Sequence, residues 1–208
     1  MKKNFSKILL ILFLIVLFLI VNIKYYASAV SSELNENIFR LHIIANSDSD
    51  SDQKLKLKVR DSIISFMEEL EKQCKTKDDV INIVNSNISN FENIAKNTIK
   101  ENGFDYDVSI EVGEFYFPTK YYGNISMPAG MYDAIKIEIG DAKGQNWWCS
   151  LFPPLCFTDI SSGIVDEEAN MQLEKNLDNE EYSIITSTSS TYKFKFKLVE
   201  ILNLKNIL

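Results

Sequence analysis

Arginine and histidine are almost absent from this chain. Its 208 residues include two arginines, Arg40 and Arg60, and one histidine, His42, so nearly every basic side chain is a lysine. A planar guanidinium can bind a carboxylate through two parallel hydrogen bonds, which an ammonium group does not reproduce. We therefore expect Arg40 and Arg60 to occupy positions that need this geometry. Their expected partners are carboxylates, such as Asp48 or Asp61, or a second protein.

The chain also lacks an apolar run of the usual membrane-spanning length. Its longest run, from Ile8 to Val21, has 14 residues. Even 16 helical residues rise only about 24 Å, against the roughly 30 Å of a bilayer's hydrocarbon core. Three lysines precede the run and Ala27-Ser28-Ala29 follows it, as in a secretory signal peptide. We predict a signal peptide over residues 1–29, cleaved before Val30. The alternative is an uncleaved, short membrane anchor that ties an extracytoplasmic domain to the membrane.

Both interpretations carry the rest of the chain across a membrane, because the lysines before the apolar run stay in the cytoplasm. Removing residues 1–29 takes away four lysines and no acids, which leaves 18 basic and 29 acidic residues and a net charge of -11. Such a surface repels phosphate backbones, so nucleic acid is excluded as a partner. Residues 30–208 show no internal repeat and no long linker, and their length suits a single domain.

Periodicity predicts an α+β fold. Residues 38–45 have the composition of a buried strand, and residues 108–112 and 135–139 alternate apolar with polar side chains as half-buried strands do. Apolar residues at spacings of three and four predict one helix from residue 53 to about 73 and a second from residue 77 to about 99. We expect a mixed β-sheet with these two helices packed as an antiparallel pair on one face.

The remaining segments carry weaker patterns. Residues 140–157 are predicted as a loop rich in aromatic residues, proline and cysteine, and residues 164–177 as a short helix. Residues 192–199 alternate aromatic side chains with lysines, which predicts a last strand. A helical end is expected at residues 200–204.

Two of the three cysteines lie close together. Cys149 and Cys156 are seven positions apart with two prolines between them, and in an exported chain this spacing favours a loop closed by a disulfide. One alternative is a pair of reduced, buried cysteines under an aromatic lid. Another is a catalytic Cys149 paired with His42. Cys74 is predicted to be a free thiol.

A polar loop over residues 46–52 contains Asp48-x-Asp50-x-Asp52, the start of a calcium-binding pattern. The pattern then fails, because Gln53 stands where the turn glycine is required and Val59 where the bidentate glutamate is required. We therefore predict that this loop caps the following helix and binds no metal. The sequence predicts no cofactor.

Two stretches resemble the stage II sporulation protein R family and together cover about residues 38–159. The first reads Arg40-Leu41-His42-Ile43-Ile44-Ala45-Asn46-Ser47-Asp48-Ser49, then Asp52-Gln53-x-Leu55-Lys56-Leu57-Lys58-Val59-Arg60-Asp61. The second includes Phe117-Pro118-Thr119-Lys120, Tyr122-Gly123, Pro128-Ala129-Gly130-x-Tyr132 and residues 144–157.

The resemblance implies a protein that is made in the forespore and secreted across its membrane into the intermembrane space. There it would be sensed by a membrane-embedded aspartic protease of the mother cell. That protease then removes the pro-sequence of a mother-cell sigma factor, sigma E. The implied role is that of a protein ligand, with no catalytic residue of its own.

The candidate partner-binding residues are polar and aromatic side chains within the two stretches, since Trp and Tyr near an Arg are typical binding hot spots. They are Arg40, His42, Asn46, Asp48, Arg60, Trp147 and Trp148. The rival hypothesis is an exported Cys/His hydrolase or thiol-redox protein that acts on a peptide or a cell-wall substrate. It requires the sulfur of Cys149 within reach of His42, beside an open cleft.

Overall fold

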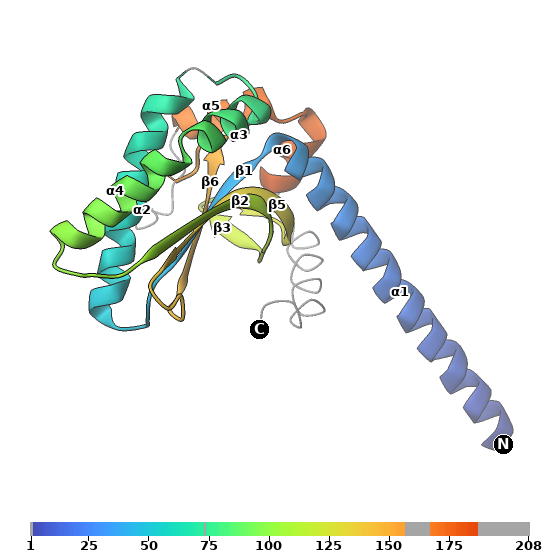
Figure 1. Cartoon of the computed structure of the whole chain (residues 1–208). Helices are drawn as coiled ribbons and strands as arrows, with labels where there is room; N and C mark the ends of the chain where they lie inside the picture. The colour runs from blue at the N-terminus through green and yellow to red at the C-terminus, as the bar shows by residue number, and fades with distance from the viewer. Residues whose placement is uncertain (1, 73, 157–166, 187–208) are drawn as a thin grey trace.

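A four-stranded mixed β-sheet lies at the centre of the protein, with helices packed on one of its faces (Figure 1). The structure is a computed structural model and describes residues 2–72, 74–156 and 167–186. The spatial order of the strands is β2 (Val108–Phe117), β5 (Gly130–Ile139), β1 (Phe39–Ile44) and β6 (Asn146–Phe152). β1 pairs parallel to β5, whereas the other two pairings are antiparallel. The predicted α+β class is confirmed.

β1 lies in the interior of the sheet, as its apolar sequence predicts. Leu41 and Ile43 are fully buried and point toward the helices, because successive side chains of a strand alternate between the two faces. Arg40 and His42 consequently point to the opposite face. We call the face that carries Leu41 and Ile43 the helix face, and the face that carries Arg40 and His42 the second face.

Two long antiparallel helices, α2 (Asp50–Glu71) and α4 (Ile88–Glu101), cover the helix face. Their opposite directions follow from the contacts between them, since Thr98 donates a hydrogen bond to Ser62 at 3.0 Å while the rings of Phe91 and Phe66 meet at 4.9 Å. The apolar residues whose spacing predicted the helices were expected to face the sheet, and most of them do. Leu55, Val59, Val84 and Phe91 are at most 2% exposed, whereas Phe66 and Ile83 are partly buried.

The predicted second helix is in fact two helices, α3 (Lys77–Ser86) and α4. Asn87 interrupts them with a non-helical backbone, at φ -115° and ψ 12°. Its side-chain amide donates to the carbonyl of Ile83 at 2.8 Å. Asparagine competes for backbone hydrogen bonds in this way and so favours helix ends over helix interiors. The prediction of one continuous helix was therefore wrong at this residue.

The predicted loop at 140–157 was also wrong in part, because it contains strand β6. Two short strands, β3 (Lys120–Tyr122) and β4 (Ile125–Met127), form a separate hairpin. Toward the C-terminus, α5 (Glu167–Asn176) falls within the predicted helical segment, and α6 (Asn179–Thr186) packs on β4 without having been predicted. The strand expected at 192–199 and the helical end at 200–204 lie outside the described residues.

The N-terminal helix α1 (Lys2–Asn37) projects away from the rest of the structure (Figure 1). Its last turn joins the domain: Leu34 is fully buried, and the side-chain oxygen of Asn35 accepts the N–H of Asp133 at 2.7 Å. The side chains from Ile8 to Leu19 are exposed. Across the described ranges, no helix reaches the combined length and apolarity that a membrane crossing demands.

Candidate functional site

His42 occupies the centre of a polar and aromatic cluster on the second face. Its ring stacks on Trp148 with the centroids 3.6 Å apart, and the ring of Phe117 meets its edge at 6.0 Å. Nε2 lies 2.6 Å from the side-chain oxygen of Asn146, to which it donates. Burial lowers the pKa of His42 to about 4, and the nearby charges of Lys136 and Arg40 act in the same direction. The imidazole is therefore neutral at neutral pH.

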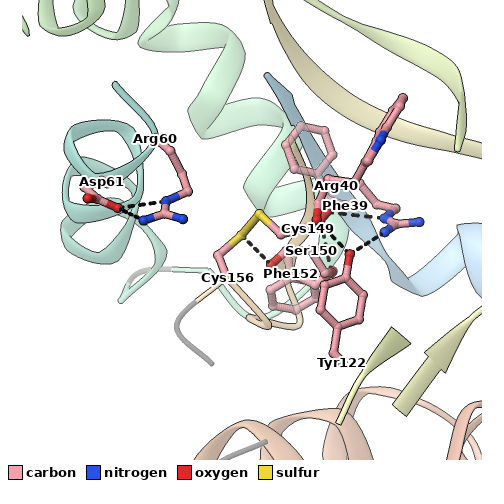
Figure 2. The surroundings of a disulfide bond; sticks show 10 residues. Phe39, Arg40, Arg60, Asp61, Tyr122, Cys149, Ser150, Phe152 and Cys156 are labelled. Atoms are coloured by element: carbon pink, nitrogen blue, oxygen red, sulfur yellow. Dashed lines mark hydrogen bonds and ion pairs between the residues drawn. A yellow bond between two sulfur atoms is a disulfide. The ribbon is translucent and has the colours of Figure 1, made fainter. Parts of the chain in front are cut away.

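Arg40 lies on the same face of β1, two residues from His42, and is fully buried. Its Nε donates to the carbonyl of Cys149 at 3.3 Å and one terminal nitrogen donates to the hydroxyl of Tyr122 at 3.0 Å (Figure 2). The guanidinium carbon also sits 4.2 Å from the ring centroid of Phe117 and 5.1 Å from that of Tyr132. Aromatic rings and two neutral oxygens thus surround this charge.

Arg40 does not pair with Asp48, one of the carboxylates suggested as partners for the two arginines. Within the described part of the chain, Arg40 has no carboxylate partner. The reason is geometric, since Arg40 is near the start of β1, whereas Asp48 lies in the exposed loop beyond the other end of that strand. The planar guanidinium of Arg40 stacks on aromatic rings while its nitrogens donate to two separate oxygens, a geometry that a lysine ammonium does not reproduce.

Arg60 belongs to the opposite side of the sheet. It is on α2, where its Nε donates to the neighbouring Asp61 at 2.8 Å and its guanidinium carbon lies 4.3 Å from the ring centroid of Trp147. The expected pairing with Asp61 is present. Trp147 stands in register with Ile43 and therefore points to the helix face, whereas Trp148 points to the second face. The two tryptophans and the two arginines do not form one site.

Cys149 and Cys156 are joined by a disulfide, with their Cα atoms 5.3 Å apart (Figure 2). Cys149 stands in register with Leu41 and points to the helix face, while His42 points to the other face. The reactive pair required by the hydrolase hypothesis is therefore not assembled. Cys74 is a free thiol, and burial together with the charges of Asp79 and Glu71 raises its pKa.

The loop over residues 46–52 organises the start of α2. Ser49 is the N-cap and accepts the backbone N–H of Asp52 at 3.2 Å, as predicted. Asn46 and Ser47 donate to the carboxylate of Asp52 at 2.8 and 2.5 Å. Burial opposes ionisation of Asp52, but these hydrogen bonds outweigh it and lower the pKa of the carboxyl. Asn46 thus stabilises the loop, whereas Asp48 is exposed on it.

Sequence reasoning missed four residues that build the cluster: Phe117, Tyr122, Lys136 and Asn146. Phe117 and Tyr122 lie inside the second family-like stretch, so the resemblance already pointed to that region. Lys136 alternates with buried isoleucines and was recognisable as a residue of the solvated side. Asn146 required knowledge that β6 is a strand. In the ranges described, no group of three or more His, Cys, Asp or Glu side chains could hold a metal ion.

Fold and site together define a single-domain α+β protein that carries a polar and aromatic cluster on one face of its sheet, with Cys149 and His42 on opposite faces. The family described as stage II sporulation protein R matches residues 35–162. The chain is also 36% identical over 141 residues to stage II sporulation protein R of Bacillus subtilis (strain 168). The chain belongs to the stage II sporulation protein R family, which confirms the resemblance seen in its sequence.

The aligned region covers 67% of this chain and 63% of the Bacillus subtilis protein. The chain thus spans somewhat less than two thirds of that relative's length. No solved structure matches the chain.

Proposed function

We propose that this protein is an exported signalling ligand which activates a membrane-embedded aspartic protease of the mother cell. The activated protease removes the pro-sequence of sigma E. Membership of the stage II sporulation protein R family is the observation that carries this proposal. The net charge of the exported part, -11 from 18 basic and 29 acidic residues, favours a soluble protein ligand over a nucleic-acid binder.

The cluster on the second face supports binding as the mode of action. Trp148 is only partly buried and Asn146 is exposed, so both are available to a partner, while Arg40 and His42 beneath them are buried and fix their positions. A rigid, partly exposed aromatic side chain that packs on buried residues is typical of an interface hot spot. The rival hydrolase or redox activity lacks this support, because Cys149 is 1% exposed and bonded to Cys156.

The proposed location is the space between the forespore and mother-cell membranes. The exposed apolar side chains of α1 from Ile8 to Leu19 suit a leader that enters a membrane. Cleavage before Val30 would preserve the contacts of Leu34 and Asn35 with the domain, because both residues follow the cut. Retention of the leader would instead leave the domain anchored on the same side of the membrane.

Reconstitution in a bacterium that does not sporulate tests the proposal. The full chain, the protease and pro-sigma E are expressed together, and removal of the pro-sequence is followed by immunoblot. We expect processing only when all three are present, and none with a chain that lacks residues 2–29 and therefore stays in the cytoplasm. Equal processing without this protein, or with the leaderless chain, would overturn the proposal.

A further inference from the structure

Lys56 of α2 is a buried cation without a carboxylate partner. It is 4% exposed, and across the described ranges no acidic group lies within ion-pair distance of its Nζ atom. Burial lowers the pKa of this group, although the charge of Asp48 opposes the change. Nζ instead donates to the carbonyl of Gln145 at 2.9 Å and to the side-chain oxygen of Gln53 at 2.7 Å. These hydrogen bonds offset the hydration that the ammonium group loses on burial.

The hydrogen bond to Gln145 is made where strand β6 begins. The carbonyl of Gln145 belongs to the planar peptide unit whose nitrogen is that of Asn146, the first residue of β6. Its hydrogen bond to the neighbouring strand segment is long, since the backbone nitrogen of Ala45 lies 3.5 Å from the carbonyl oxygen. The shorter bond from Lys56 therefore fixes the orientation of this peptide unit. It also sets the direction in which the side chain of Asn146 leaves the backbone.

Gly144 brings the same loop into backbone contact with the loop that precedes α2. Its N–H donates to the carbonyl of Ala45 at 2.9 Å, and a Cβ atom at this position would collide with the carbonyl oxygen of Ser47. The side-chain amide of Gln53 donates to that carbonyl of Ser47 at 2.8 Å. Lys56 and Gln53, which bond to each other, thus hold both loops from one turn of α2.

Asn146 connects this network to the candidate binding residues on the second face. Its side-chain oxygen lies 2.6 Å from Nε2 of His42, and the ring of His42 stacks on Trp148. Trp148 follows Asn146 by two positions on β6, so both side chains point to the same face. A shift at the start of β6 would therefore loosen the hydrogen bond to His42 and move the ring of Trp148. Lys56, from a helix on the other side of the sheet, reaches the second face through this chain of contacts.

We propose that Lys56 is a positioning residue for protease binding, which fixes the start of β6 so that Asn146 and Trp148 are held in the geometry that the protease recognises. This inference rests on the proposed function and adds a residue that does not itself contact the partner. Affinity increases when contact side chains are already held in their bound positions, because less freedom is lost on binding. The contribution of Lys56 to stability is small, since a buried charge can often be replaced by an apolar side chain without loss.

Replacement of Lys56 with Met tests the proposal, because Met has a similar length but neither a charge nor a hydrogen-bond donor. The full chain is combined with the purified protease in detergent micelles, and binding is measured beside the melting temperature of the free chain. Lys56→Met should weaken binding by about tenfold. Its melting temperature should stay within about 3 °C of wild type. The control Lys54→Met, at an exposed position of the same helix, removes the same charge and should change neither quantity.

Normal binding by Lys56→Met would overturn the inference while the proposed function stands. A larger fall in its melting temperature would assign Lys56 to the fold alone and would overturn the inference as well. Failure of the wild-type chain to bind the protease contradicts the proposed function itself.

The fluorescence of Trp148 supplies a local measurement that a purely structural role would not change. In chains that carry Trp147→Phe, acrylamide should quench Trp148 about twice as strongly after Lys56→Met, because the ring is held less firmly. Lys56→Met should also weaken binding much less in a chain that already carries Trp148→Ala, because the ring that it positions is gone. Unchanged quenching, or losses of binding free energy that simply add, would show that Lys56 does not act through Trp148 and would overturn the inference.

Discussion

His42 and Trp148 stack face to face on the second face of the sheet, with ring centroids 3.6 Å apart and an interplanar angle of 16°. They belong to neighbouring strands and stand directly opposite each other in the register. His42 is 7% exposed, so protonation would place a charge in a nearly dry setting beside Lys136 and Arg40. The stack therefore depends on a neutral imidazole.

Replacing His42 with Gln should remove an acid-sensitive part of the stability. The pKa of His42 falls from 6.5 to about 4 on folding, so the unfolded chain takes up the proton first as the pH decreases. The contribution of the neutral imidazole to the free energy of unfolding is complete above pH 6.5 and is lost as the pH falls toward 4. Urea unfolding measures the difference in free energy of unfolding between wild type and His42→Gln. This difference should change by roughly 2 kcal/mol between about pH 7.5 and about pH 4.5. A difference that does not change with pH would contradict the lowered pKa of His42.

Glu71 shows the opposite dependence. Burial, together with the charge of Glu68, raises its pKa to about 7. Protonated Glu71 therefore contributes fully to the free energy of unfolding in acid, and this contribution is lost as the pH rises through about 7. Glu71→Gln should melt at a higher temperature than wild type at about pH 8 and at the same temperature at about pH 4. The control Glu69→Gln, at an exposed position on the same helix, should show no such dependence.

Sequence patterns predicted the elements whose apolar period is regular. β1, α2 and the alternating halves of β2 and β5 were predicted because one side of each is uniformly apolar. β6 was missed because its tryptophans and the prolines that follow it resemble a loop composition, although Trp147 and Trp148 do alternate between the faces. The break at Asn87 was hidden because apolar residues continue in helical spacing on both sides of it.

The surroundings of Arg40 could not be predicted from the sequence for a different reason. Its aromatic neighbours Phe117, Tyr122 and Tyr132 come from three strands more than 75 positions away in the chain, so only the sheet order brings them together. The sequence identified Arg40 as unusual and suggested a carboxylate or a second protein as its partner. The rarity of arginine in the sequence therefore identifies Arg40, whereas the order of the strands determines which side chains surround it.

The two arginines should respond differently to replacement by lysine. Arg40→Lys loses the hydrogen bond to Cys149 and the stacking on Phe117, and it leaves a buried ammonium, so it should lower the free energy of unfolding by about 2 to 4 kcal/mol. Arg60→Lys should cost under about 1 kcal/mol, because its pair with Asp61 is close to solvent. Urea unfolding of both variants measures the difference, and equal losses would contradict the distinct roles assigned here.

Thiol labelling should report one reactive cysteine in the oxidised protein. Cys149 and Cys156 are bonded to each other, and Cys74 is free. Mass measurement after alkylation should therefore show one label, and three after denaturation and reduction. Opening the disulfide should also lower the free energy of unfolding by roughly 2 kcal/mol, since a short loop is no longer closed in the unfolded chain. Three labels without reductant would contradict the pairing.

The two adjacent tryptophans separate binding from folding. Trp148→Ala removes a partly exposed ring from the second face and should weaken activation of the protease by about 2 kcal/mol or more if this ring anchors the partner. Trp147→Ala removes a ring packed between the sheet and Arg60, and should lower the free energy of unfolding by about 3 kcal/mol while activation at equal folded concentration is retained. Titration of pro-sigma E processing against each variant, beside its melting curve, distinguishes the two effects.

The same titration decides between a ligand and an enzyme. A ligand must occupy its protease, so activation should saturate near equal amounts of the two proteins, whereas a hydrolase would act at trace levels through turnover. His42→Gln should then be tolerated wherever the fold survives, because the imidazole is buried, neutral and turned away from Cys149. The result that would contradict the ligand role is a His42→Gln or Cys149→Ser protein that folds and binds the protease normally yet activates nothing. Only the loss of a chemical step would explain that combination.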